Sequence, residues 1–164
     1  MTIVKKILIG LIVIFILMQA YRTPKNSGND ITKDISNSYI IPDSVKTILT
    51  KACNDCHSNH TRYPWYAEVQ PVSWWIGDHV KDGKKHFNLN EFNGYRIAKQ
   101  YKKLEECIKE VKEGGMPLPS YTIIHRDAIL TDSEKNTLYT WSQNIRDSIK
   151  AKYPADSLVI KKKK

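Results

Sequence analysis

The sequence predicts one small, mainly α-helical domain that follows an apolar N-terminal segment. Apolar residues recur at every third or fourth position in four stretches of the chain, which is the spacing of one helix face. No stretch shows the alternation of apolar and polar residues that a half-buried strand requires. The chain has 164 residues, of which 41% are hydrophobic, and this size fits a single domain. A multidomain enzyme is therefore not expected.

The charge distribution argues against a nucleic-acid-binding protein. The chain has a net charge of +9, but 15 basic and 14 acidic residues nearly cancel between Asp43 and Asp147. The excess of positive charge therefore lies in the two flanks, and the domain itself has no basic face of the kind that binds nucleic acid. Three cysteines, an odd number, also argue against a framework of disulfides.

The first 21 residues have the pattern of an export signal. An uncharged apolar run over residues 7–20 follows Lys5 and Lys6. Cleavage at the end of this run would need a small residue where Met18 stands, so we expect an uncleaved membrane anchor, with a cleaved signal peptide as the alternative. No cysteine follows the run, so lipid modification is not expected. The lysines before the run place the remainder on the periplasmic side of the bacterial inner membrane.

Two polar segments flank the predicted domain of residues 40–149. Residues 22–39 are rich in Asn, Asp, Ser and Lys without apolar periodicity, which predicts a polar tether. Residues 150–164 end in four lysines and are interpreted as a solvated basic tail, with weak attraction to anionic lipid as the minor interpretation.

The first two predicted helices carry the most distinctive residues. One opens at Asp43, its expected N-cap, and closes with the cysteines and His57. The other opens at Gln70 and Pro71, since proline fits the first helical position. The residues expected to face inward are Val45, Ile48, Leu49, Ala52, Cys53 and Cys56 in the first helix, and Val72, Trp75, Ile76, His79 and Val80 in the second.

The last two predicted helices have clear termini. The third spans about Arg96 to Glu113, and the two glycines that follow end it. The fourth begins at Thr131, which with Glu134 matches a capping box. The residues expected to face inward are Tyr101, Leu104, Cys107, Ile108 and Val111 in the third helix, and Leu138, Trp141, Ile145 and Ile149 in the fourth.

The sequence CNDCH at residues 53–57 matches the attachment pattern of c-type haem. Cys53 and Cys56 lie one helical turn apart and can bond the two vinyl groups on one edge of a porphyrin. His57 can then reach the iron with a ring nitrogen. The motif therefore predicts a cytochrome c-like helical domain around one covalently bound haem.

Three other interpretations of the cysteine pair are weaker. A redox dithiol normally follows a strand, and no strand is predicted before Cys53. Structural zinc normally needs a second close pair, whereas Cys107 stands alone and is expected to be a small buried hydrophobe. A disulfide between Cys53 and Cys56 is compatible with export.

Met116 is the preferred sixth ligand to the iron. It is the only methionine between the export segment and the C-terminus, and it follows the glycines that end the third helix. A thioether paired with histidine is usual in electron-transfer haems, although most methionines only fill a core. Four histidines are its rivals: His125 is the most credible, whereas His79 fits a core position, His60 stands too close to the motif, and His86 is in a loop.

Further residues near the motif are expected at the haem edge. Their aromatic rings can pack on the porphyrin and their polar groups can donate to its propionates, although Trp65 and Trp75 also suit a core. These residues are Arg62, Trp65, Tyr66, Trp74 and Trp75.

The stretch CNDCHSNHTRYPWYAEVQPVSWW at residues 53–75 resembles the bacterial haem-binding domain family of cytochrome c-like proteins. Later segments HV.DG, MP, SY..IH and LYTW extend the resemblance over about residues 40–145. It implies a monohaem protein, periplasmic or membrane-anchored, in which Cys53 and Cys56 bind the porphyrin and His57 binds the iron. In cytochromes c generally a Met-Pro ligand precedes the last helix, as Met116 does here.

These observations predict a carrier of single electrons between envelope redox partners, with His57 and Met116 on the iron. The alternative is a haem-based sensor or a peroxide-handling protein whose sixth ligand is labile. No catalytic acid–base arrangement can be assigned from the sequence, so an enzyme is not expected. A haem-free dithiol module would require the motif to be accidental.

Overall fold

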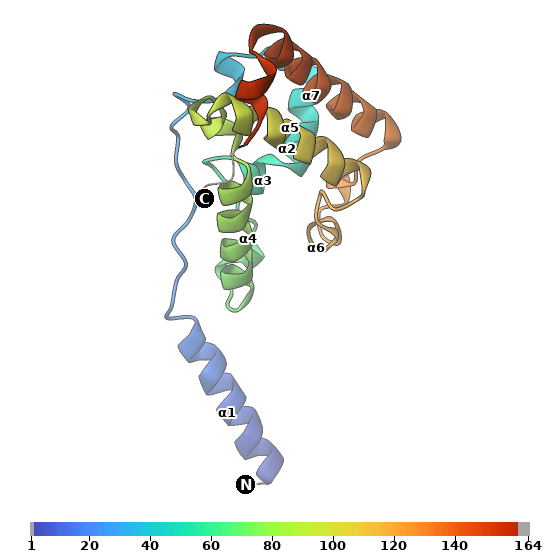
Figure 1. Ribbon diagram of the computed structural model, residues 1–164. Helices are drawn as coiled ribbons and strands as arrows, with labels where there is room; N and C mark the ends of the chain where they lie inside the picture. Colours follow the sequence, from blue (N-terminus) through green and yellow to red (C-terminus); the bar gives the residue numbers. More distant parts are fainter. Residues whose placement is uncertain (1, 161–164) are drawn as a thin grey trace.

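The structure, a computed structural model, describes residues 2–160 and is mainly helical, as the sequence predicts (Figure 1). No strand occurs within these residues, where Ser27 and His60 form one isolated bridge. The α-helices are α1 (Ile3–Met18), α2 (Asp43–Ala52), α3 (Asn54–His57), α4 (Val72–His86), α5 (Ile97–Lys112), α6 (Pro119–Thr122) and α7 (Asp132–Lys152). Short 3-10 turns join them: η1 (Ile35–Asn37), η2 (Trp65–Glu68), η3 (Leu89–Gly94), η4 (Arg126–Ala128) and η5 (Ala155–Leu158).

The main core lies where α7 packs on α5 and α2. The predicted inward face of α7 is confirmed, because all four of its residues are buried. The predicted capping box at its start is also confirmed, with Thr131 and Glu134 each accepting a hydrogen bond from the other's backbone N–H. The largest apolar side chains of the core that are less than 2% exposed are Phe92, Ile35, Leu104, Leu138, Ile149 and Val45.

The first predicted helix is two helices in the structure. α2 ends at Ala52, and Cys53 leaves the helical conformation with φ −127° and ψ −45°. α3 then forms a separate turn that carries Cys56 and His57. Asp43 is the first residue of α2 rather than its N-cap, which is Pro42.

The buried face of α4 is narrower than predicted. Val80 is its only buried residue, whereas Val72 is 38% and Trp75 is 47% exposed. The reason is that α4 stands at one end of the domain, where it packs mainly on α3 and η2 (Figure 1). An apolar stripe in the sequence thus predicts the helix, but it does not predict how much of that stripe is buried by neighbouring elements.

Residues 22–39, the predicted polar tether, are bonded to the domain in the structure. Ile35 is 1% exposed, and η1 packs on η3. The side chain of Asn26 donates to Ser58 O at 3.0 Å and to Thr61 Oγ1 at 2.9 Å. Polar side chains that bond to distant residues hold this segment, so apolar periodicity could not reveal it. We call residues 22–30 the strap.

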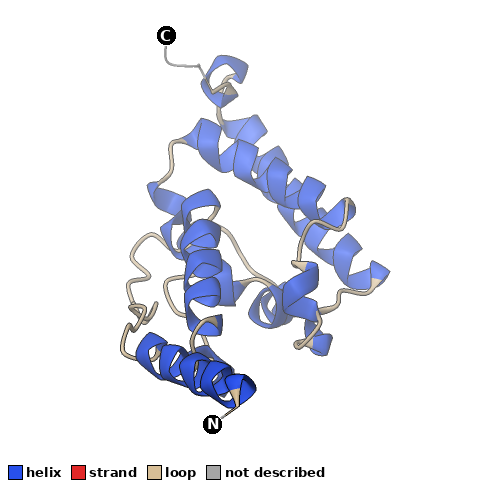
Figure 2. Ribbon diagram, turned by 90° about the horizontal axis from the view of Figure 1, so that it is seen from below, coloured by secondary structure: helices blue, strands red, loops and turns tan. Residues whose placement is uncertain are grey.

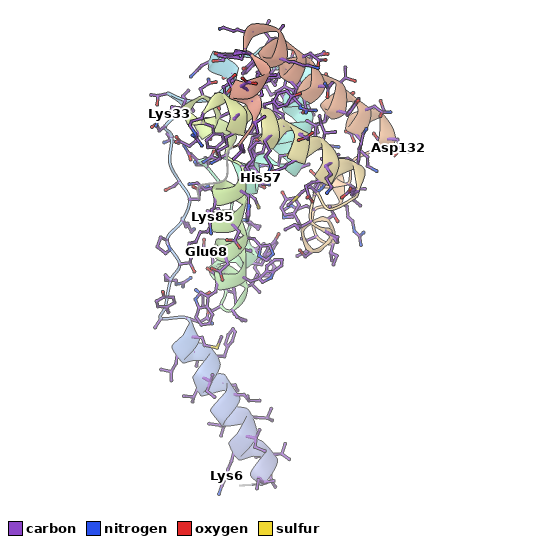
Figure 3. All side chains as sticks on the ribbon, viewed as in Figure 1. Lys6, Lys33, His57, Glu68, Lys85 and Asp132 are labelled. Atoms are coloured by element: carbon purple, nitrogen blue, oxygen red, sulfur yellow. The ribbon has the colours of Figure 1, made fainter. Side chains whose placement is uncertain are left out.

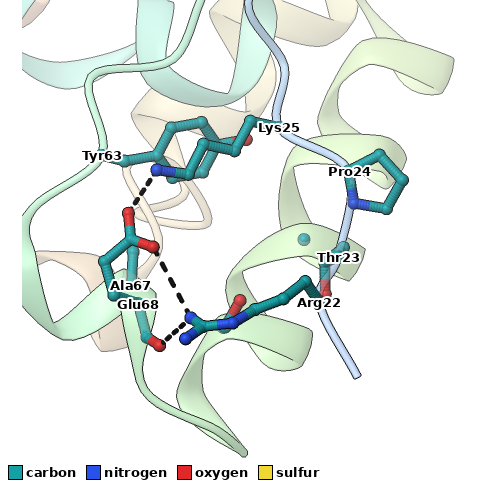
Figure 4. A pocket seen from close by; sticks show the side chains of 9 residues that line it. Arg22, Thr23, Pro24, Lys25, Tyr63, Ala67 and Glu68 are labelled. Carbon is teal, nitrogen blue, oxygen red and sulfur yellow. Dashed lines mark hydrogen bonds and ion pairs between the residues drawn. The ribbon is translucent and has the colours of Figure 1, made fainter. Parts of the chain in front are cut away.

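Ion pairs fix one end of the strap, and a hydrogen bond fixes the other. Arg22 and Lys25 both form ion pairs with Glu68 of η2, around a cavity of about 280 Å³ that contains none of the predicted ligands (Figure 4). Asn59 Nδ2 donates to Asp30 O at 3.0 Å.

The C-terminal segment also belongs partly to the domain. α7 continues to Lys152, and Leu158 of η5 packs against the core beside α5. The basic end of the predicted tail, Lys161–Lys164, lies outside the described residues.

α1 projects away from the domain, at the end where α4 begins (Figures 1 and 2). None of its residues is buried. Among residues 2–160, no helix combines the length and the apolar composition needed to cross a bilayer.

Candidate functional site

One cavity of about 500 Å³ brings the predicted ligands together. Cys53, Cys56, His57 and Met116 all line it, and most of its remaining wall is apolar. Its size falls within the range of small-molecule and cofactor sites. α2 and α3 form one wall, α4 and α5 form two more, and the segment after α5 closes it. The apolar residues of the wall are Leu49, Ala52, Phe87, Leu89, Val111, Pro117, Leu118 and Leu130.

The turn of α3 places both attachment thiols in this cavity. His57 N donates to Cys53 O at 2.9 Å, so the three motif residues occupy one turn. All three cysteines are free thiols. Burial raises the pKa of Cys56 to about 11 and raises that of Cys53 further. Redox dithiols need a lowered thiol pKa, so this environment disfavours that interpretation.

His57 is held in the orientation that an iron ligand needs. Its Nδ1 lies 2.8 Å from Phe87 O, the usual arrangement in which the ring donates to a backbone carbonyl. Burial lowers the pKa of His57, although the hydrogen bond to Phe87 opposes this effect. A neutral imidazole that donates from Nδ1 keeps a lone pair on Nε2, and that nitrogen is then available for a metal.

Gly83 lets α4 approach the attachment turn closely. A Cβ atom at this position would lie 2.5 Å from Cys56 O and 2.9 Å from Cys56 Cβ. No side chain can occupy that space without moving α3. Gly83 is therefore a positioning residue that sequence reasoning missed, although it ends the HV.DG segment.

We expect Gly83→Ala to displace Cys56 and to destabilise the protein by about 2 kcal/mol, as overpacking typically does. The yield of covalent haem per mole of protein should fall with it. Gly94→Ala is the control, because the Cβ there would meet only the flexible side chain of Lys33. Denaturant unfolding and haem absorbance measure both effects. If both variants had the same stability and the same haem content, the close approach of α4 to Cys56 would have no consequence for either property.

Met116 reaches the cavity through the turn that ends α5. Gly114 adopts φ +75°, a left-handed conformation that suits glycine at a helix C-terminus. Met116 N then donates to Glu110 O at 3.1 Å, which turns the chain back toward α3. The half-buried methionine thus lines the same cavity as His57.

Tyr121 links the methionine segment to the attachment motif. Its hydroxyl donates to Asp55 Oδ2 at 2.8 Å, and Asp55 lies between the two attachment cysteines. Arg62 Nε pairs with Asp55 Oδ1 at 3.1 Å, so the buried carboxyl group has partners on two sides. Burial is the main cause of the raised pKa of Tyr121. The SY..IH segment contained this residue, but nothing in it indicated its partner.

Removing this link should loosen the methionine segment. We expect Tyr121→Phe to cost about 1.5–3 kcal/mol, the usual contribution of a hydrogen bond to a charged group. A merely structural role would leave the predicted ligand Met116 in place, whereas a positioning role would weaken the sulfur-to-iron absorption band expected of a bound methionine. Tyr139→Phe is the control, since among residues 2–160 the Tyr139 hydroxyl forms no hydrogen bond. An unchanged band in Tyr121→Phe would contradict the positioning role.

The structure places the four rival histidines in different surroundings. His79 and His86 line the large cavity, whereas His60 lies at the exposed bridge to Ser27. His125 lies outside it, in a smaller adjoining cavity, where its Nε2 is 2.7 Å from the Tyr66 hydroxyl. The structure therefore favours His79 and His86, the last residue of α4, over His125 as alternatives to Met116, which reverses the order drawn from the sequence.

The other predicted haem-edge residues lie beside the large cavity rather than in it. Arg62, Tyr66 and Trp75 line the smaller cavity, which shares Asp55, Cys56, His79, Leu118 and Tyr121 with the large one. Trp65 lines neither and is 80% exposed, and Trp74 donates to Tyr21 O. Cys107 lines the large cavity, a position that its helix stripe alone did not reveal.

The residues present fit a covalently bound haem. Two thiols one turn apart, a neutral imidazole and a thioether meet in one largely apolar space. Among residues 2–160, no group of three or more His, Cys, Asp or Glu side chains could hold a metal ion by itself.

Comparison with known proteins gives one match. The family described as "Haem-binding domain" matches residues 13–144 of the chain. No curated protein and no solved structure matches the chain.

Proposed function

This chain belongs to the haem-binding domain family, and from that premise we propose that it is a monohaem c-type cytochrome that carries single electrons between envelope redox partners. The observation that carries the proposal is that Cys53, Cys56, His57 and Met116 line one cavity. In cytochromes this ligand set closes both axial positions, which suits electron transfer rather than ligand activation.

In this proposal each residue has a separate task. The thiols of Cys53 and Cys56 would form the two thioether bonds that retain the cofactor. His57 would hold the iron through Nε2, while Phe87 O fixes the ring orientation through Nδ1. Met116 would supply a second ligand to the iron. Bound haem supplies an iron that changes oxidation state by one electron. The wall is mainly apolar, which limits reorganisation around the changing charge, although Asp82, Lys103, Glu106 and Glu110 also line it.

We further propose that α1 anchors the protein on the periplasmic side of the bacterial inner membrane. Lys5 and Lys6 near its start can extend toward the headgroups, and Tyr21 after its end suits the opposite interface. Its partners are then other redox proteins of the envelope.

The alternative function is a haem-based sensor or a peroxide-handling protein. It is favoured by one observation: Met116 follows a turn and precedes the short helix α6, rather than standing on a core helix. A ligand on such a segment can be displaced with little cost to the core.

Absorption spectroscopy of the protein made in a host with haem-attachment machinery tests the proposal. We expect haem that survives denaturation and a reduced form that does not bind carbon monoxide. Rapid carbon monoxide binding by the wild-type protein would favour the sensor, and absence of covalent haem would refute both functions.

A further inference from the structure

Five exposed apolar side chains gather at the end of the domain from which α1 projects. We call them the apolar patch: Trp65, Val72, Trp75, Ile123 and Ile124, which are 80%, 38%, 47%, 64% and 60% exposed. They come from η2, from α4 and from the turn that follows α6. Three parts of the patch meet at the small cavity: Trp75 and Ile124 line it together with Tyr66, whose ring centroid lies 5.9 Å from that of Trp65.

Hydrogen bonds fix the end of α1 beside this patch. Gln70 N donates to Gln19 Oε1 at 2.9 Å, and Gln19 Nε2 donates back to Gln70 O at 3.3 Å. Gln70 Nε2 and Trp74 Nε1 both donate to Tyr21 O, at 2.9 and 3.1 Å. Gln70 is fully buried, so this junction is part of the domain rather than a loose connection.

The strap continues the same attachment. Gly77 of α4 leaves room for Thr23, whose Cγ2 would lie 2.6 Å from a Cβ at that position. Glu68, close to Trp65 in the sequence, is paired with Arg22 and Lys25 (Figure 4). Two positive charges therefore compensate the negative charge of Glu68 near the exposed ring of Trp65. The end of α1 lies next to the start of α4 (Figure 3).

The length of α1 fixes where this end of the domain would lie in a membrane. Its 16 residues span about 24 Å, whereas the hydrocarbon core of a bilayer is about 30 Å thick. A segment shorter than the hydrocarbon core is accommodated by local thinning of the bilayer or by snorkelling of its flanking residues, so the residues that follow it would lie at the interfacial region. Those residues are joined to the start of α4, and tryptophan is the side chain that the interfacial region favours.

We propose that the apolar patch rests in the headgroup region of the bilayer that holds α1, so that the domain sits on the membrane in one orientation. The inference depends on the membrane placement proposed above and adds to it a second contact with lipid. The occupant is the lipid interface itself, because the patch continues the surface that α1 already presents.

The test compares two side chains of equal exposure within the full-length holoprotein. Ile123 belongs to the patch and Val159 lies near the C-terminus, and each is 64% exposed. The protein is reconstituted into phosphatidylcholine vesicles, floated, and oxidised by hydroxyl radicals, and mass spectrometry measures both sites. We expect Ile123 to be oxidised at least fivefold more slowly than Val159. Trp65 should be protected with it.

The outcomes separate the proposals. Flotation with equal oxidation of Ile123 and Val159 would overturn the patch contact and leave the anchor intact. If the protein did not float with the vesicles, both the patch contact and the membrane anchor would be overturned. Protection that rises with protein concentration at constant lipid would show that a second copy covers the patch and would also overturn it. Haem absorbance of the same sample reports independently on the proposed function.

Discussion

The double variant Cys53→Ser/Cys56→Ser is expected to contain no covalently bound haem. Each thioether bond needs one thiol, and both thiols of the motif lie in the wall of the same cavity. Each single variant should be left with haem held at one edge or should fail to mature. Mass spectrometry of the denatured protein measures the adduct directly.

Cys107→Ser is the matched control for this experiment. Cys107 lines the same cavity, and burial raises the pKa of its thiol to about 11, but it stands on α5 outside the motif. We expect its covalent haem content to equal that of the wild type. A haem adduct that persisted in the double variant would remove the main argument for a c-type cytochrome.

Met116→Ala is expected to convert a six-coordinate iron into one with an open or water-filled position. The weak sulfur-to-iron band of the oxidised form should vanish completely, and the reduced form should bind carbon monoxide. Loss of a soft, neutral thioether in favour of a harder oxygen ligand stabilises ferric iron, so the reduction potential should fall. Absorbance and redox titration measure these changes.

Two histidine variants make the result decisive. His125→Ala should leave the band and the potential unchanged, because His125 bonds to Tyr66 outside the large cavity. His79→Ala is the sharper comparison, since His79 lines the cavity and bonds through Nδ1 to Trp75 O at 2.9 Å. If His79→Ala opened the iron and Met116→Ala did not, the ligands would be two histidines and Met116 would only fill space.

Local sequence signals predicted much of the fold. The capping box at Thr131 and the four buried residues of α7 depend on neighbours three or four positions away, which periodicity detects directly. The spacing of the CNDCH motif likewise determines that its thiols share one turn. The sequence offered Met116 and four histidines as candidates for the sixth ligand. In the structure, Met116 and His57 line the same cavity.

Contacts between distant residues were not predictable in the same way. The role of Gly83 depends on the carbonyl of Cys56, and that of Tyr121 depends on Asp55. Neither pair leaves a periodic signal. The strap was missed because its segment is polar throughout, and a polar sequence looks the same whether it bonds to water or to a folded surface.

The packed strap limits how the protein can meet other molecules. A flexible chain over residues 22–39 would have an r.m.s. end-to-end length of about 23 Å. A domain joined to its membrane anchor by such a chain could adopt many positions and orientations above the membrane. Bonds from Asn26, Arg22 and Lys25 remove that freedom. In the proposed membrane placement, encounters then depend on lateral diffusion in two dimensions, and a partner must present its own redox centre at a matching height above the lipid. Orientation would be set before collision, so lengthening the strap would slow electron exchange with membrane-bound partners even though every ligand to the iron stayed in place.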